Sequence, residues 1–164
     1  MTEILEGMTI VDFSTGWPGS IATMVLSDFG AEVIKVEPIT GDPYRAFPQS
    51  SLWNRGKKSL VLDLATEGDL RTARSLIKKS DIVVESFSPG EADSLGIGYD
   101  EMSVSRPDLV YCSITAFGPK GRYAQYKPYE GIVAAKAGRY TVFTGQTRRP
   151  GPHYGAVQIA SHGT

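Results

Sequence analysis

The residues best spaced for ligand chemistry lie in the first apolar run, the turn after it and the next run. Gly16 and Gly19 follow the run at 8–13, and Glu37 ends the second one. In a doubly wound α/β fold such a turn binds phosphates, and an acid at the second strand end binds a ribose. A nicotinamide-cofactor site is therefore one interpretation. However, the fingerprint G-x-G-x-x-G is absent, and Pro18 lacks a backbone N–H that a phosphate cradle would use. A tight turn and a solvated strand end are the favoured interpretation.

Two other groups of polar residues could contribute to a site. Residues 54–58 place three cations beside Gly56, just before an apolar run, where they could bind phosphates. A solvated basic loop explains the same pattern equally well. Lys127, Tyr129 and Glu130 form a compact titratable cluster after a loop. Without further information, the start of a helix is favoured there over the edge of an active site.

Other catalytic chemistries have little support. His153 and His162 have no acidic or cysteine partner at metal-ligand spacing, so we expect no metal site. No G-x-S-x-G nucleophile motif occurs. Cys112 lies within an apolar run, which favours a packed thiol over a nucleophile.

Composition narrows the class of protein. The 164 residues suffice for one domain with a real core, and the net charge of −1 argues against nucleic acid or an anionic membrane as a partner. No apolar run approaches the ~20 residues that cross a bilayer, and the first residues lack a secretory pattern. The single cysteine suits a reducing compartment, so we expect a cytoplasmic location.

The elements that must position these residues alternate along the chain. Short apolar runs predict five strands, and helical spacing between them predicts crossover helices, which together indicate an α/β fold with a mainly parallel sheet and helices on both faces. Thr66 and Asp100 are predicted helix caps. Residues 38–56 lack periodicity and are predicted to form a long loop. The predicted strands are 8–13, 32–37, 58–62, 81–85 and 109–115, and a last helix is expected within 129–142.

Several stretches of the chain, in this order, resemble class III CoA-transferases, a family that also contains alpha-methylacyl-CoA racemases. Each stretch alone is a modest signal, but the ordered set is specific. The matching stretches are 5–13 (LEGMTIVDF), 28–37 (DFGAEVIKVE), 41–43 (GDP), 54–59 (NRGKKS), 81–90 (DIVVESFSPG), 95–96 (LG), 107–114 (PDLVYCSI), 117–118 (FG) and 129–130 (YE).

The resemblance implies a Rossmann-like fold and a chemistry. Such enzymes form interlocked dimers and move coenzyme A between carboxylic acids through mixed anhydrides and aspartyl-CoA thioesters, which is covalent catalysis by a carboxylate. Residues 1–164 would be the N-terminal, CoA-binding portion of the large domain, without the small domain or the returning C-terminal segment. The implied substrates are an acyl-CoA and a carboxylic acid, with no metal. The implied partner is a second copy or a catalytic half.

The resemblance also implies roles for individual residues. Lys57 would bind a phosphate of CoA, Phe87 would offer an apolar face, and Glu130 would support the nucleophile rather than replace it. The residues expected around CoA or the acyl group are Trp17, Lys57, Ser86, Phe87, Lys127 and Tyr129.

The most consequential departure lies at the position of the nucleophile. Residues 155–164 resemble the segment that holds the nucleophilic aspartate, and Ala160 stands in its place. Alanine cannot form an anhydride or a thioester, so we expect a non-catalytic CoA-binding or scaffold half. Residues 130–139 are similar to the N-terminal halves of fused, two-domain members. The alternatives are a racemase, whose histidine–aspartate pair would fall at Tyr129 and Ala160, and a nicotinamide-dependent oxidoreductase.

Overall fold

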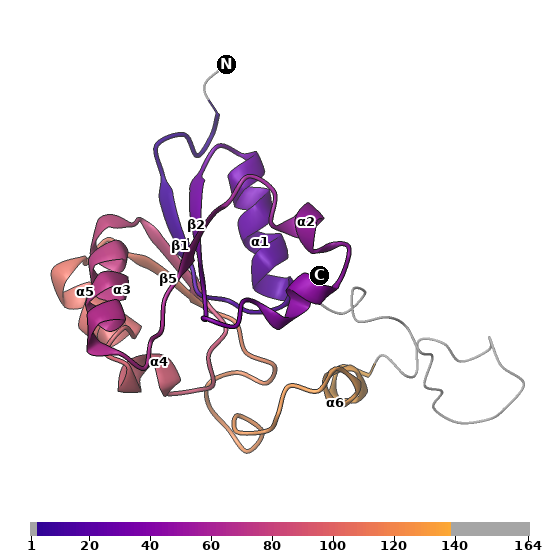
Figure 1. Ribbon diagram of the computed structural model, residues 1–164. Coiled ribbons are helices and arrows are strands. Elements are labelled where there is room, and N and C mark those ends of the chain that lie inside the picture. The colour runs from indigo at the N-terminus through magenta and orange to yellow at the C-terminus, as the bar shows by residue number, and fades with distance from the viewer. Residues whose placement is uncertain (1–2, 139–164) are drawn as a thin grey trace, which may run out of the picture. The chain divides into compact units, whose positions relative to one another are not determined.

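Five parallel strands form one sheet in the order β3-β2-β1-β4-β5 (Figure 1). The computed structural model describes residues 3–138. This architecture confirms the predicted parallel α/β fold. The strands are β1 (Thr9–Asp12), β2 (Glu32–Glu37), β3 (Lys58–Val61), β4 (Ile82–Glu85) and β5 (Val110–Ser113).

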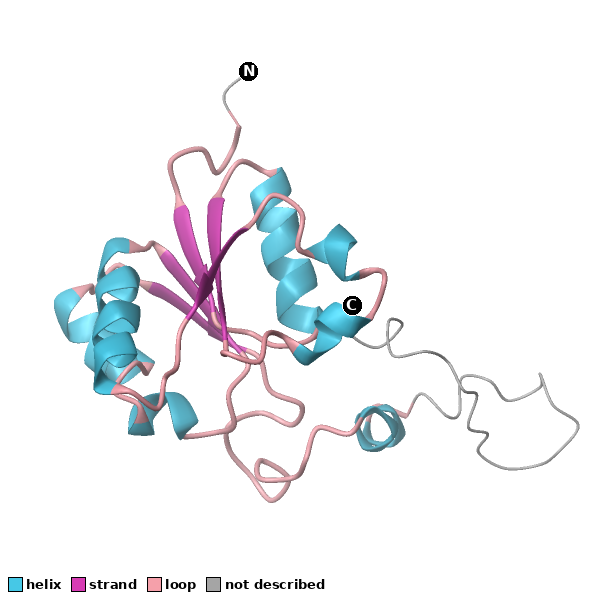
Figure 2. Cartoon of the chain, in the orientation of Figure 1, coloured by secondary structure: helices cyan, strands magenta, loops and turns pink. Residues whose placement is uncertain are grey.

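Helices cover both faces of the sheet (Figure 2). Helix α1 (Trp17–Asp28) packs against β1 and β2 on one face. Helix α3 (Glu67–Lys79) and helix α5 (Tyr99–Ser105) pack against each other on the opposite face, and the short α4 (Glu91–Ser94) precedes α5. Each strand alternates its side chains between these two layers.

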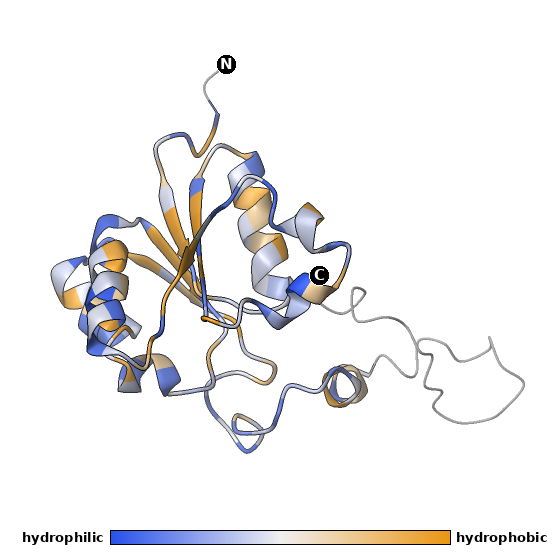
Figure 3. Cartoon of the chain, viewed as in Figure 1, coloured by the Kyte–Doolittle hydropathy of each residue, from blue (hydrophilic) through white to orange (hydrophobic). Residues whose placement is uncertain are grey.

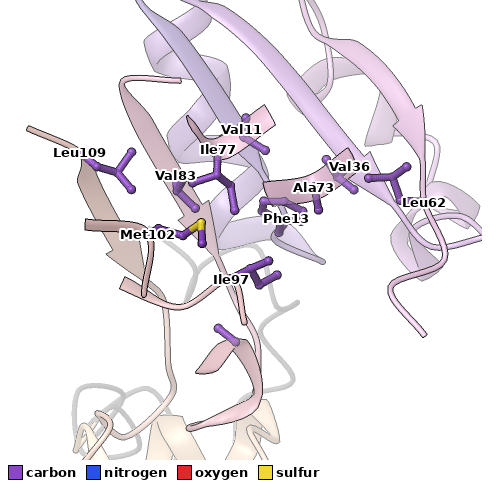
Figure 4. Packing of buried hydrophobic residues seen from close by; sticks show 11 residues of the cluster. Val11, Phe13, Val36, Leu62, Ala73, Ile77, Val83, Ile97, Met102 and Leu109 are labelled. Atoms are coloured by element: carbon purple, nitrogen blue, oxygen red, sulfur yellow. The ribbon is translucent and has the colours of Figure 1, made fainter. Parts of the chain in front are cut away.

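Each face has its own apolar core. On the α3 side, Val11 and Val83 of the strands meet Ala73 and Ile77 of α3 and Met102 of α5 (Figure 4). The second cluster contains Ile10, Val33 and Val84, against which Leu26 of α1 packs. Hydrophobic segments concentrate in the strands and on the helix sides that face them (Figure 3), as a sheet covered on two faces requires.

The segment between β2 and β3 was predicted to be a long loop, and the structure shows two short helices in it. It contains the 3-10 helix η1 (Pro43–Ala46) and the short helix α2 (Ser50–Trp53). Four aromatic rings hold it against the start of α1: the Trp17 ring lies 4.9 Å from that of Trp53, 5.7 Å from that of Phe47 and 6.0 Å from that of Tyr44. Aromatic packing of this kind was not visible as periodicity, because the four residues belong to three separate elements.

One predicted helix cap is confirmed and one is wrong. The hydroxyl of Thr66 accepts a hydrogen bond from the N–H of Asp69 at 3.3 Å and caps α3. Asp100 does not cap α5, because that helix begins one residue earlier, at Tyr99, and its N-cap is Gly98. Asp100 lies instead in the first turn, where a carboxylate favours the helix dipole.

The described residues from Ala116 to Gly138 belong to a second compact unit. It contains helix α6 (Glu130–Lys136) within the predicted range 129–142. The rings of Tyr123 and Tyr126 pack edge to face, and the Arg122 and Lys136 cations stack over Tyr123 at 4.6 and 4.2 Å from its ring centre. Among the described helices of both units, none is long and apolar enough to cross a membrane.

Candidate functional site

The site lies where the strand order reverses, between the carboxyl ends of β1 and β4. The chain runs from β1 outward to β2 and β3, and then returns to the other side of β1 to form β4 and β5. At such a switch point the turns after two adjacent strands separate and leave a crevice, where open α/β sheets bind their ligands. The turns concerned are residues 13–16 after β1 and 86–88 after β4.

A pocket of about 540 Å³ occupies this edge of the first unit. Its lining comes from the carboxyl ends of β1, β2, β3 and β4 and from the turns that follow them. The apolar part includes Phe13, Val36, Leu62 and Phe87. This volume is within the roughly 300–1,000 Å³ that small-molecule sites in proteins occupy.

Hydrogen bonds connect the two turns that form the crevice. The N–H of Thr15 donates to the Ser86 hydroxyl at 2.9 Å, and the N–H of Phe13 donates to the Val84 carbonyl at 2.8 Å. The rings of Phe13 and Phe87 lie 6.1 Å apart. Ser86 and Phe87, which were predicted site residues, therefore both line the pocket, while their contact with CoA stays a prediction.

The first turn is shaped by close packing. A side chain at Gly19 would bring its Cβ within 2.0 Å of the Ser14 hydroxyl, so only glycine allows α1 to start this close to the turn. Gly16 has φ of 82°, which favours glycine. Both glycines thus fit the tight-turn interpretation of the sequence.

Glu85 is a buried carboxylate at the start of the turn, residues 85–87, that the resemblance places along the CoA groove. It ends β4 with 5% exposure, and it accepts a hydrogen bond from the N–H of Phe87 at 2.6 Å. Burial raises the pKa of Glu85, which the hydrogen bonds with Ser113 and the Phe87 N–H oppose. The carboxylate fixes the direction of the turn that carries Phe87.

Behind the first turn lies a buried network of two lysines and two aspartates. The ammonium group of Lys35 donates to the Ser14 carbonyl at 2.7 Å and lies 3.8 Å from Asp12 and 3.5 Å from Asp42. All of these ionic side chains are at most 2% exposed. Asp42 also accepts hydrogen bonds from Gly16 N–H and Tyr44 N–H, so the network joins the β1 turn to the segment after β2.

Lys57 belongs to this network rather than to an exposed basic loop. Its ammonium group donates to Thr23 at 2.7 Å and to the Ser20 carbonyl at 2.8 Å, and lies 3.4 Å from Asp12. Burial lowers the pKa of Lys57 to about 8, while Asp12 partly opposes that shift. A phosphate would reach this side chain, which is 2% exposed, only after these hydrogen bonds broke. Its phosphate role stays a prediction, and the solvated-loop alternative is wrong for this residue.

Glu37 is also not the solvated strand end that the sequence suggested. Its carboxylate accepts four hydrogen bonds, from Arg45 twice, from Asp42 N–H and from Ser59. The Arg45 hydrogen bonds lower its pKa to about 2. A carboxylate offers about four acceptor sites. Glu37 therefore has no site left for a ribose hydroxyl, which removes the observation that favoured a nicotinamide cofactor.

The other predicted site residues occupy different surroundings. Trp17 begins α1 and is 6% exposed within the aromatic cluster described above. Tyr129 is 60% exposed and forms the N-cap of α6, which Glu130 begins, and Lys127 is exposed shortly before it. Lys127, Tyr129 and Glu130 belong to the second unit, so the structure does not test whether they contact the pocket. Ala160 lies outside the described residues.

Cys112 was expected to be a packed thiol, and this is wrong. It is exposed on β5, which is an edge strand of the sheet. Within residues 3–138, no three His, Cys, Asp or Glu side chains are grouped as a metal ion would need.

Comparison with known proteins establishes the family. The family model described as CoA-transferase family III matches residues 5–164. The chain belongs to CoA-transferase family III. Acetyl-CoA:oxalate CoA-transferase of Acetobacter aceti is 38% identical over 142 residues, which cover 81% of this chain and 36% of that protein. The CoA-transferase/lyase DddD of a Marinomonas species is 38% identical over 138 residues, 84% of this chain but 16% of that protein.

A solved structure of the family agrees with this fold. The crystal structure of Rv3272 from Mycobacterium tuberculosis superposes with a TM-score of 0.85 at 36% identity, covering 96% of this chain and 44% of that one. The family match and this similarity confirm the resemblance seen in the ordered motifs. The chain spans less than half the length of each of these relatives.

Proposed function

We propose that this chain is the CoA-binding N-terminal part of an acyl-CoA:carboxylate CoA-transferase. The observation that carries the proposal is the pocket at the switch point, lined by Ser86 and Phe87, in a chain of CoA-transferase family III. Relatives of this chain act on acyl-CoA and carboxylates by their names, for example acetyl-CoA and oxalate. The substrates proposed here are an acyl-CoA and a carboxylic acid.

The proposed chemistry needs a carboxylate nucleophile. Its oxygen attacks the thioester carbonyl carbon, the C–S bond breaks, and CoA thiolate departs to leave an enzyme–acyl anhydride. The thiolate then attacks the enzyme's own carbonyl carbon in that anhydride, the C–O bond to the donor acyl group breaks, and the donor carboxylate is released, which leaves an enzyme–CoA thioester. The acceptor carboxylate attacks that thioester and displaces CoA thiolate, which forms a second anhydride. The thiolate attacks the acceptor acyl carbon of this anhydride, which gives the new acyl-CoA and frees the enzyme carboxylate. A site for these intermediates must exclude water, because anhydrides and thioesters hydrolyse.

In this proposal residues 1–164 do not supply the nucleophile. Ala160 stands at the position that the family resemblance gives to the aspartate, and its side chain has no oxygen. The chain would bind and orient CoA, Glu130 would support the reacting group, and a catalytic half would carry the carboxylate. That half would be a second domain or another copy in an interlocked homodimer, in a reducing cytoplasm.

The binding part is tested by calorimetric titration of the chain with CoA and acetyl-CoA. We expect saturable binding that Phe87→Leu weakens severalfold, because Phe87 lines the pocket. Phe29→Leu is the matched control, since Phe29 is a half-exposed aromatic residue just after α1 and does not line the pocket. Tight binding of NADH with none of CoA would overturn the proposal.

The catalytic part is tested with hydroxylamine, which cleaves acyl-enzyme anhydrides and thioesters. The chain is incubated with acetyl-CoA and a labelled carboxylic acid, and both adducts and CoA transfer are measured. We expect neither. A trapped adduct on Glu130, or turnover that Glu130→Gln abolishes, would show that the nucleophile lies in this chain after all.

A further inference from the structure

The charged residues of the chain are unevenly distributed between its two units. Residues 1–115 contain 17 Asp and Glu against 10 Lys and Arg, whereas residues 116–164 contain 7 Lys and Arg and one acid, Glu130. The net charge of −1 therefore combines an acidic first unit with a basic second unit. A basic segment attracts anionic ligands even in a chain that is nearly neutral as a whole.

Three aromatic rings form a cluster in the described part of the second unit. The rings of Tyr123 and Tyr126 lie 5.4 Å apart. The ring of Phe117 lies 6.2 Å from that of Tyr123 and 6.5 Å from that of Tyr126. Each ring thus contacts the other two at distances typical of aromatic pairs. These contacts hold the loop before α6 in one arrangement.

Two cations are bound to the same ring of this cluster. The Arg122 guanidinium lies 4.6 Å and the Lys136 ammonium 4.2 Å from the centre of the Tyr123 ring. Arg122 comes from the loop and Lys136 from the last turn of α6, so the ring joins the two segments. The two positive charges cannot be farther apart than the sum of their distances to the ring.

The ring attracts each cation through its quadrupole, but it has no net charge and neutralises neither of them. Arg122 and Lys136 are both exposed, as are Lys120 and Lys127 in the same segment. None of these four cations forms an ion pair with a residue between 3 and 138. A ligand with two or more negative charges would replace the repulsion between the two ring-bound cations with attraction.

We infer that Arg122 and Lys136, held on the Tyr123 ring, form a binding site for a diphosphate group. A guanidinium donates two parallel hydrogen bonds to one phosphate, and an ammonium binds the next phosphate as a point charge. A single carboxylate would pair with only one of the two cations. The inference does not depend on the proposed function, because none of these three residues is among those that the family resemblance places around CoA.

Two kinds of molecule carry a diphosphate group. One is the CoA substrate proposed above, in which the diphosphate joins the nucleotide to pantetheine. The other is a free nucleoside diphosphate. The two cations would recognise the same group in both, so the binding experiment has an arm for each source.

The test is calorimetric titration of the full chain with inorganic pyrophosphate at low and high salt. We expect saturable binding at low salt that weakens at high salt, because dissolved ions screen exposed charges. Arg122→Gln combined with Lys136→Gln should weaken binding about tenfold or more, since the contacts to both phosphates are lost.

A matched control removes the same charge elsewhere. Lys78→Gln combined with Lys79→Gln neutralises two exposed lysines in the last turn of α3, in the first unit. The affinity for pyrophosphate should then change by less than about twofold, because distant exposed charges are screened.

Conservative variants separate the role in binding from a role in folding. Lys136→Arg keeps a cation and Tyr123→Phe keeps a ring, so each should retain the affinity within about twofold. Arg122→Lys keeps the charge but should weaken binding severalfold, because an ammonium cannot donate two parallel hydrogen bonds to one phosphate. Circular dichroism checks that each variant is folded.

The outcomes separate this inference from the proposed function. Pyrophosphate that does not bind, or that binds the double variant as tightly as the control variant, would overturn the inference even where CoA binds. Pyrophosphate binding with none of CoA would support the inference and refute the proposed function. Where both bind, displacement of pyrophosphate by CoA or by ADP supports the inference and assigns the diphosphate to that source.

Discussion

The buried network behind the first turn makes a strong prediction about stability. Replacing Lys35 with Met keeps the length of the side chain but removes an ammonium group whose side chain is 2% exposed. The Ser14 carbonyl then loses its donor, and Asp42 loses its ion pair. Asp12 keeps Lys57 at 3.4 Å, so one carboxylate remains compensated.

The expected magnitude follows from these partners. Removing one member of a buried ion pair costs about 3–5 kcal/mol, and the remaining Lys57–Asp12 contact places this case near the lower end. We therefore expect Lys35→Met to lower the free energy of unfolding by about 3 kcal/mol. For a domain of this size that corresponds to a Tm lowered by roughly 6–12 °C.

Urea denaturation followed by circular dichroism measures this free energy. Arg55→Met is the control, because Arg55 pairs with Asp28 where both side chains are more than 40% exposed, and such pairs contribute about 0–1 kcal/mol. Adding Asp42→Asn to Lys35→Met should recover about 1 kcal/mol, since the uncompensated charge is removed while the Tyr44 hydrogen bond can persist. If Lys35→Met cost no more than the Arg55 control, the network would not stabilise the fold as argued.

Three further predictions concern pH and reactivity. The pKa of Glu37 is lowered from 4.5 to about 2, so its ion pair stabilises the fold above pH 4.5 and this contribution is lost as pH falls towards 2. Arg45→Ala should therefore raise the pH midpoint of acid unfolding. It should also lower the free energy of unfolding at neutral pH by about 1–2 kcal/mol, a small value because the Arg45 side chain is half exposed and solvent screens the pair. The pKa of Lys57 is lowered from 10.5 to about 8, so between pH 8 and 10.5 the unfolded chain binds more protons than the folded chain. The free energy of unfolding should therefore rise with pH over this range. Lys57→Met should remove that rise, as measured by urea titrations at successive pH values. Cys112 should react with a thiol reagent in the native protein at a rate close to that in urea, and a rate at least a hundredfold slower would contradict its exposure.

The local sequence determined the elements and their class. Apolar runs predicted all five strands, and the second was predicted with its observed bounds, Glu32–Glu37. The cap at Thr66 was predictable because a threonine hydroxyl followed by an acidic first turn satisfies N–H groups only a few residues away. The order of the motifs also determined the family, since their spacing reflects the alternation of strands and turns. The strand and cap signals are local, and short-range physics decides them.

The surroundings of the charged side chains were decided only by the tertiary structure. Lys35 and Glu37 lie in a predicted strand and Lys57 lies in a basic stretch. Each is bound to partners that other elements bring near: Asp12 from β1, and Asp42 and Arg45 from the segment after β2. Burial of a charge is favourable only where opposite charges and hydrogen bonds converge on it. That convergence depends on strand order and on the packing of α1, neither of which a single segment encodes.

The same reason explains the error at Cys112 and the character of the pocket. A run such as VYCS has the composition of a buried strand, but β5 lies at the edge of the sheet, and the packing of neighbouring layers decides which positions are covered. The pocket likewise combines residues from four strand ends that are far apart in the chain. The sequence indicated where each strand ends to within two residues. The parallel order of the strands determined that Phe13, Asp63 and Phe87 would surround one crevice, because parallel strands bring all their carboxyl ends to a single edge.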